Sequence, residues 1–499
     1  MENDKRFKGS PDKEKLKQEA AEKYYYGIDK EIDLVKIAKA YMAIVGDGRG
    51  GIVHENTLHQ AGDYLGRAHD LFVDIKDGKP VFRQFDIVMT NPPFGANIKV
   101  LKDEASYFQL GHAWKKDDDG NWQLLPKTKA TAPQILFVER CLDMLKDGGI
   151  LAIILPETIF HAINSRYVLN FIKKNNNIKA IVDLAHNTFR PYNNAKTLLF
   201  ILQKGRPQQA NIIMAVAEET GHDHQGRTLY RFDYQTKSFT KDIWDDTIAI
   251  REELKHPSDK NNQYVFIVKS DDIKSDIYVP RYYWQKRAQS ILEEIKESGY
   301  EPIRIQKLLD EKIIVAYKGY GSPPSGYKGR GDIPYIRVAD IINWELYKNP
   351  TAFVPREIYL KIKGNGVYLL PEDVIFVRRG SYRIGSVAMV SPFDTEVLLT
   401  GELVIIRVVR ADNEYDINPY YLIYLLSNHL TQRQLPQKVL VDTTLPNIAN
   451  RWKELYLPTL KDKAEIKRMT ERIKSTFVSK WKAQEEILKL RAEFGNITT

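Results

Sequence analysis

The chain has almost no cysteine. Its 499 residues include a single one, Cys141. One thiol can form neither a disulfide framework nor a cysteine-based zinc site within the chain, so the sequence excludes both. Cys141 lies in an apolar helical pattern, which favours a packed core thiol over a catalytic nucleophile.

Long hydrophobic runs are also lacking. The longest apolar stretches, such as residues 150–155 and 198–202, are far shorter than the roughly 20 residues that span a bilayer. The first 23 residues are charged and contain no apolar signal-peptide core. We therefore expect no membrane association and a cytoplasmic location.

Positive charge is in excess. Lys and Arg number 74, Asp and Glu number 65, and the net charge is +9. This balance suits a polyanionic partner such as DNA, although a solvated lysine surface gives the same number. We find no convincing nuclease motif and expect no metal site. The net charge therefore indicates a polyanionic partner only if sequence motifs also point to one.

Residues 24–205 alternate short apolar runs with helical patterns, which is typical of an α/β domain with a doubly wound sheet. Helices are expected over residues 32–45 and 133–145. The expected strands are residues 25–28, 51–54, 85–90, 150–155, 178–184 and 197–203. The pattern predicts a Rossmann-like sheet.

The rest of the chain falls into three parts. Residues 206–300 are polar and predict a linking region with a helix over 287–298. Residues 301–460 are rich in strand patterns and Gly/Pro turns, which predicts a second α/β domain. Residues 461–499 carry apolar residues at helical spacing up to residue 494, which predicts one long amphipathic helix. Pairing with a partner helix in a coiled coil is favoured, and docking on its own domain is the alternative.

The sharpest motif is an apolar strand, residues 85–90, that runs directly into Asn91-Pro92-Pro93-Phe94. An exocyclic amino group on a nucleobase is a poor nucleophile, because its lone pair is delocalised into the ring. The Asn91 side-chain oxygen and the Pro92 carbonyl can accept hydrogen bonds from such a group and localise that lone pair. Two consecutive prolines stiffen the turn, and Phe94 offers a face for a flipped-out base. A plain Asn-Pro turn after a strand is the alternative.

With this motif and its surroundings, the sequence resembles the modification subunits of type I restriction systems and related fused enzymes, which are DNA adenine-N6 methyltransferases. The resemblance covers nearly all of residues 24–205. It implies S-adenosylmethionine as cofactor, with Asp29 bonding the ribose hydroxyls, Asn56 touching the cofactor adenine, and Asn91 beside both cofactor and target. A helix N-cap is the alternative role for Asp29. The wider family often has Asp where this chain has Asn56.

One part of the family pattern is not found. In the family, a strand followed by a Gly-x-Gly turn precedes the Asp29 segment and holds the methionine end of the cofactor. The residues before Tyr26 contain no such turn. We therefore expect the cofactor to bind weakly to this chain alone. A split gene with a partner chain, truncation of a longer fused enzyme and an inactive remnant are the explanations left open.

The second half resembles the target recognition domains of type I specificity subunits. The matching stretches are residues 316–341, 369–386, 418–428 and 443–458, in the family's order. Basic side chains stand there among glycines and tyrosines, where they can meet phosphates and base edges, or serve as ordinary surface charges. The DNA-binding candidates are Lys328, Arg330, Arg337, Arg378, Arg379 and Arg383.

Two functions compete. The first is a site-specific DNA adenine-N6 methyltransferase of a restriction-modification system with a fused DNA-reading domain. The second is a DNA-binding specificity component that lacks chemistry of its own and needs a partner chain. In either case we expect double-stranded DNA as a partner, and a homodimer or further restriction-modification subunits joined through the final helix.

Overall fold

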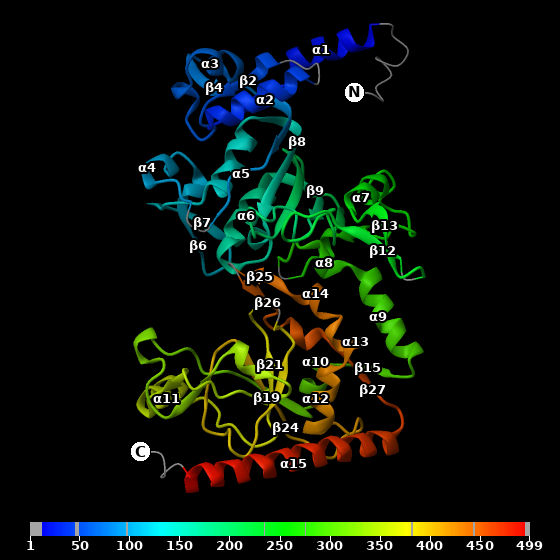
Figure 1. The fold of residues 1–499 in the computed structure, drawn as a ribbon. Helices are drawn as coiled ribbons and strands as arrows, with labels where there is room; N and C mark the ends of the chain where they lie inside the picture. The colour runs from blue at the N-terminus through cyan, green and yellow to red at the C-terminus, as the bar shows by residue number, and fades with distance from the viewer. Residues whose placement is uncertain are drawn as a thin grey trace. The chain divides into compact units, whose positions relative to one another are not determined.

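The computed structural model describes residues 12–44, 49–95, 98–233, 235–274, 276–380, 383–442 and 445–494. Val45, the expected end of the first helix, and residues 443–444 of the last recognition stretch lie outside these ranges. The chain forms two compact units, unit 1 (Met1–Pro280) and unit 2 (Arg281–Thr499) (Figure 1).

Unit 1 is built on a mixed six-stranded sheet with the order β14-β11-β9-β10-β8-β5. Its strands are β5 (Phe85–Thr90), β8 (Leu145–Pro156), β9 (Asn176–Asp183), β10 (Thr197–Lys204), β11 (Asn211–Val216) and β14 (Val265–Lys269). β5 is parallel to β8, and β10 is antiparallel to both β8 and β9. β5, β8 and β9 therefore run in one direction, and their carboxyl ends lie at the same edge of the sheet.

Alternating side chains build the core of this sheet. On β8, Leu151, Ile153 and Leu155 are completely buried, and α5 (Pro133–Asp143) packs against this strand. Burying such a side chain contributes about 1.5–3 kcal/mol. Cys141 on α5 is buried, and its burial raises the pKa of the thiol to about 12. The prediction of a packed core thiol is confirmed.

Two of the six predicted strands lie outside this sheet. β1 (Gly27–Asp29) and β2 (Ile52–His54) form a separate two-stranded parallel sheet. The ring of Tyr26 lies 5.5 Å from the ring of Phe85, so an aromatic contact ties this small sheet to β5. β5 is consequently an edge strand in the described part of the chain, and its Ile87 and Met89 are 63% and 77% exposed.

The main sheet also extends beyond the predicted boundary at residue 205. β11 and β14 come from residues 206–300, which the sequence predicts to be a linking region, and they form one side of the sheet. Their apolar runs lie within a stretch that is polar overall, which hides the pattern. Met214 and Val265 are nevertheless buried. The α/β fold class itself is confirmed.

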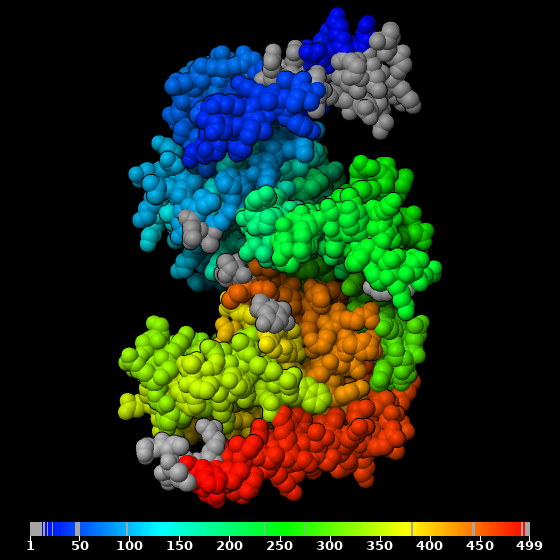
Figure 2. Space-filling view, in the orientation of Figure 1, coloured from blue at the N-terminus to red at the C-terminus, as the bar shows by residue number. Residues whose placement is uncertain are grey.

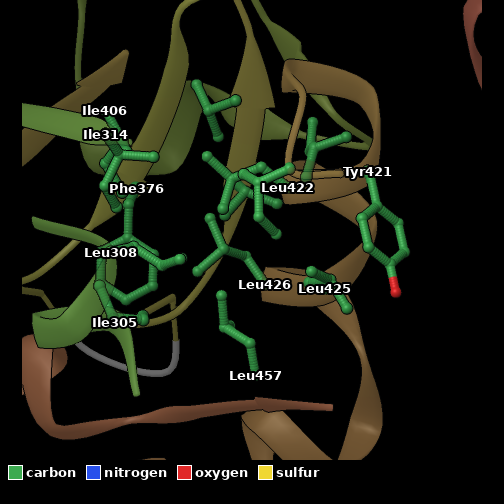
Figure 3. Packing of buried hydrophobic residues seen from close by; sticks show 14 of the residues in the cluster. Ile305, Leu308, Ile314, Phe376, Ile406, Tyr421, Leu422, Leu425, Leu426 and Leu457 are labelled. Atoms are coloured by element: carbon green, nitrogen blue, oxygen red, sulfur yellow. The ribbon is translucent and has the colours of Figure 1, made fainter. Parts of the chain in front are cut away.

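Unit 2 combines a four-stranded antiparallel sheet with helices. The sheet has the order β16-β24-β21-β22 and contains β16 (Ile314–Lys318), β21 (Val374–Val377), β22 (Val387–Met389) and β24 (Leu403–Val408). α12 (Pro419–Ser427) begins at Asn418, whose side chain accepts a hydrogen bond from the Tyr421 amide. Leucines of α12 meet Phe376 of β21 and Ile314 of β16 in the main core (Figure 3).

The predicted long helix is present as α15 (Lys463–Phe494). Its Ile466 and Phe477 are buried in the core of unit 2, and the Phe477 ring stacks on Trp344 at 6.1 Å. The apolar stripe therefore docks on its own unit, the alternative to the favoured partner helix, while Ile487 and Phe494 near its end stay exposed. Figure 2 shows α15, in red, along the surface. None of the described helices is long and apolar enough to cross a membrane.

Phe477→Ala tests this docking. We expect the substitution to lower the free energy of unfolding by about 3 kcal/mol, because it leaves a cavity where a buried ring packs. Denaturant unfolding of the full chain measures the change. Ile487→Ala on the same helix is the matched control and should change the free energy by less than about 0.5 kcal/mol. Equal effects at the two positions would contradict the docked arrangement.

Candidate functional site

Asn91 follows β5 directly, at the carboxyl edge of the six-stranded sheet. Its side chain is exposed, and among the described residues it forms no hydrogen bond. Pro92 is buried and Pro93 is exposed, so the turn is anchored on one side and open on the other. No backbone group in the described part of the turn uses the Asn91 amide, which can therefore bond an incoming group.

Phe94 closes the turn against an aromatic partner from a different loop. Its ring is 9% exposed and packs edge-on against Phe189, with ring centroids 5.6 Å apart and planes at 77°. Sequence reasoning did not single out Phe189. The sequence could have identified Phe189, because this residue follows the predicted strand β9. The carboxyl end of β9 lies at the same edge of the sheet as that of β5. The two rings form an apolar wall beside Asn91.

Buried charges support this edge of the sheet. Asp183 ends β9 and is fully buried, and its carboxylate pairs with Lys196 Nζ at 2.6 Å. The same ammonium donates to the Leu184 carbonyl. Glu157, which follows β8, is fully buried and donates its backbone N–H to the Lys196 carbonyl. An ion pair and backbone bonds thus join the loops that follow β8 and β9.

The two cofactor candidates from the small sheet lie at neighbouring strand ends. Asp29 pairs with His54 in the β1–β2 register, and Asn56 follows two residues later. Asp29 Oδ1 accepts the Glu31 amide at 2.8 Å, which is the local helix-entry role that the sequence left as an alternative. Asn56 Oδ1 accepts the Leu58 amide at 3.1 Å. Both side chains are only partly buried.

These side chains suit the polar parts of a nucleoside. Asp29 uses one carboxylate oxygen locally, which leaves Oδ2 to accept a hydroxyl proton. The Asn56 oxygen has a second lone pair and its amide has two donors. A ribose-and-adenine group therefore fits the donors and acceptors at these strand ends.

Four of the predicted DNA contacts gather where β21 ends. Arg378 and Arg379 follow β21, and a Cβ on Gly380 would lie 2.8 Å from Val338, so only glycine permits this close approach. Arg383 donates to the Ile341 carbonyl, three residues beyond Val338. Together with Arg337 these residues form a set that we call the arginine cluster (Arg337, Arg378, Arg379 and Arg383).

The guanidinium groups of the arginine cluster differ in the hydrogen bonds that they already make and in how deeply they are buried. Arg337 makes two hydrogen bonds to the buried Asp340, at 2.8 and 3.1 Å, and the hydrogen bonding raises the pKa of Arg337. Burial lowers the pKa of Arg378, and the neighbouring Arg379 cation lowers it further. Lys328 and Arg330 are exposed on a separate loop of unit 2.

Comparison with known proteins gives one family match and several relatives. A family model described as "N-6 DNA Methylase" matches residues 7–290, more than half of the chain. The methylase subunit of the type I restriction enzyme EcoEI of Escherichia coli is 28% identical over 128 residues, 25% of this chain. The type II restriction enzyme and methyltransferase RM.Eco57I of the same organism is 23% identical over 242 residues, 48% of this chain.

The chain spans less than a quarter of the length of these two curated relatives, 22% and 23%. Among solved structures, the methyltransferase subunit of a type I restriction-modification system from Streptococcus thermophilus is 18% identical, with a TM-score of 0.34. That match covers 52% of this chain and 48% of the other.

Proposed function

Because the chain belongs to the N-6 DNA methylase family, we propose that it methylates the N6 amino group of adenine in DNA at the turn Asn91–Phe94. The observation that carries this proposal is the Asn91 amide, which is exposed at the carboxyl end of β5 and forms no hydrogen bond among the described residues. It is backed by the buried Pro92 and by the Phe94–Phe189 wall.

The residues of the turn position the target adenine and activate its amino group. The target adenine leaves the base stack and enters the space beside the turn. The Asn91 oxygen and the Pro92 carbonyl accept hydrogen bonds from its amino group and localise the nitrogen lone pair, while Phe94 borders the base. By direct displacement, the nitrogen would form its bond to the methyl carbon as the carbon–sulfur bond of the donor breaks, which would leave a neutral thioether, and the nitrogen would release one proton to solvent; positioning is the main source of rate for such a step. No covalent bond to the protein is needed.

S-adenosylmethionine would supply a methyl group made electrophilic by a positively charged sulfur. Asp29 would hold the ribose hydroxyls, Asn56 would contact the cofactor adenine, and Asn91 would lie between cofactor and target. The role of Asp29 is the most specific of these, because a carboxylate at the end of a parallel strand commonly grips a ribose.

Asp29→Asn tests this role. The amide keeps an oxygen for the Glu31 N–H and so preserves the helix entry, but it removes the charge. Charge-assisted hydrogen bonds are worth about twice neutral ones, so we expect S-adenosylmethionine to bind about tenfold more weakly in calorimetry. The control is Asp33→Asn, at an 82% exposed side chain in the first turn of helix α2 (Ile32–Ile44). Unchanged affinity in Asp29→Asn would leave this residue with the helix-entry role alone.

In unit 2, we propose that the arginine cluster with Lys328 and Arg330 reads the DNA site, as the fused reader of a restriction-modification enzyme. Arginine forks bond guanine edges and phosphates. The exposed end of α15 is then assigned to contacts with a second copy or with other subunits of the system.

The deciding experiment is expression of the chain in a bacterial host that lacks its own adenine methylation. Mass spectrometry of the host DNA should reveal N6-methyladenine, and single-molecule sequencing should place it in one short sequence motif. Absence of the modified base, together with retained DNA binding, would reject the methyltransferase and leave a DNA-binding component.

A further inference from the structure

A loop beside the catalytic turn presents an aromatic side chain that the proposed chemistry does not use. The loop comprises residues 184–196 and connects β9 to β10. Tyr192 near its tip is 96% exposed, more than any other large apolar side chain in the described part of unit 1. The ring is therefore open to contact with another molecule, and its burial against such a molecule would be favourable.

Tyr192 lies close to the catalytic turn. Three residues earlier, Phe189 packs on Phe94 with ring centroids 5.6 Å apart. The Asn193 amide donates to the Phe189 carbonyl at 2.8 Å, which closes the segment into a turn. This bond closes a five-residue α-turn, which keeps the backbones of Phe189 and Tyr192 close together. The backbone of Tyr192 therefore lies close to Phe189, the residue that packs on Phe94.

The loop is braced at its base and on its flank. At the base, Lys196 pairs with the buried Asp183 and donates to the Leu184 carbonyl. On the flank, Pro191 touches Gly226, where an added Cβ would lie 3.2 Å from Pro191 Cδ. The loop that carries the exposed ring is thus held at its base by an ion pair and approached by Gly226 on one flank, while Pro191 beside Tyr192 is itself exposed.

We propose that Tyr192 inserts into the DNA duplex and fills the gap that the flipped adenine leaves, a role that rests on the proposed function. Extruding a base costs a few kcal/mol of pairing and stacking. Side chains that wedge between base steps offset this cost, and an aromatic ring stacks on any neighbouring base without regard to sequence. Tyr192 would be a positioning residue, since it touches the duplex and not the reacting nitrogen.

The first test compares Tyr192→Ala and Tyr192→Phe on two duplexes that carry the mapped target site. One duplex is fully paired, and the other has a mismatch opposite the target adenine, which already weakens pairing. On the paired duplex we expect Tyr192→Ala to lower kcat/KM by about tenfold to hundredfold, and Tyr192→Phe to stay near wild type because stacking needs the ring alone. On the mismatched duplex the loss should shrink to a few-fold.

Tyr41→Ala is the matched control, at a 64% exposed tyrosine of helix α2 (Ile32–Ile44), and should leave both rates unchanged. A merely structural role of Tyr192 would lower the rate equally on both duplexes. Equal losses, or no loss in Tyr192→Ala, would overturn the proposal while leaving the methyltransferase intact.

A second test does not depend on methylation. The photo-crosslinking residue p-benzoyl-phenylalanine replaces Tyr192 or Tyr41 in the full chain, and the protein is irradiated with duplex DNA. Crosslinks at position 192 and none at position 41 support insertion. Such crosslinks in a chain that methylates no DNA would reject the enzyme yet keep Tyr192 as a DNA contact. No crosslink at position 192 in an active enzyme would overturn the proposal.

Discussion

Asn91→Ala is expected to lower the rate of DNA methylation by about a thousandfold, because it removes a positioned group that acts on the reacting nitrogen; losses of 10²–10³ are typical when one such group is removed. The side chain makes no hydrogen bond among the described residues, so the folded state should be unaffected. The loss should therefore appear in kcat, with the affinity for DNA unchanged. Single-turnover transfer of a labelled methyl group measures it.

The controls separate chemistry from structure. Asn91→Asp keeps an acceptor oxygen in the same place and should retain far more activity than Asn91→Ala. Asn121→Ala, at an exposed asparagine between β6 (His112–Lys116) and β7 (Trp122–Thr128), should be indistinguishable from wild type. If Asn91→Ala retained wild-type kcat, the turn would have no part in the reaction.

Asp373→Ala is expected to give the largest loss of stability, about 4 kcal/mol. The Asp373 carboxylate accepts two hydrogen bonds from Arg407, both at 2.7 Å, and a third from the Leu370 amide at 2.8 Å. The Asp373 side chain is 1% exposed and the Arg407 side chain is 18% exposed. Removing one member of such a pair leaves an uncompensated charge in the interior. For a unit of this size the melting temperature should fall by roughly 10 °C, measured by calorimetry of the full chain.

This ion pair also bears on the surface that we propose reads DNA. Asp373 immediately precedes β21, and β21 leads into Arg378 and Arg379. DNA affinity should therefore fall together with stability in Asp373→Ala. Asp412→Ala, at an exposed carboxylate of the same unit, should change neither property. A melting temperature within about 2 °C of wild type in Asp373→Ala would show that water or another group compensates Arg407.

Sequence patterns predicted the elements that repeat over several residues. The strand over 85–90 has the predicted ends, and the long final helix has the predicted extent up to residue 494. Both depend on local periodicity, which the chain carries in its own order of side chains. The packing of α15 could not be read in this way, because an apolar stripe looks the same whether it meets its own domain or another chain.

Contacts between residues that are far apart in the sequence were the other feature that local patterns could not predict. The contact between Phe94 and Phe189 joins segments 95 residues apart, and the ion pair of Lys196 and Asp183 depends on how β9 and β10 are paired. β11 and β14 were missed because they lie in a stretch that is polar overall, although each is about as long as β5. Their place in the sheet follows from pairing, to which composition contributes little.

The exposed edge of β5 in the described part of the chain affects how the purified protein behaves. Native sheets usually blunt such margins with lysine, proline or a bulge. β5 has an irregularity between Phe85 and Ile87 and a proline, Pro92, just beyond its other end, but Ile87 and Met89 between these points are 63% and 77% exposed. Backbone amides and carbonyls along that margin can template a strand from any neighbouring molecule. We therefore expect the isolated chain to aggregate, and its solutions to become turbid, as the protein concentration rises. A strand from another chain that pairs with the β5 edge would prevent this aggregation.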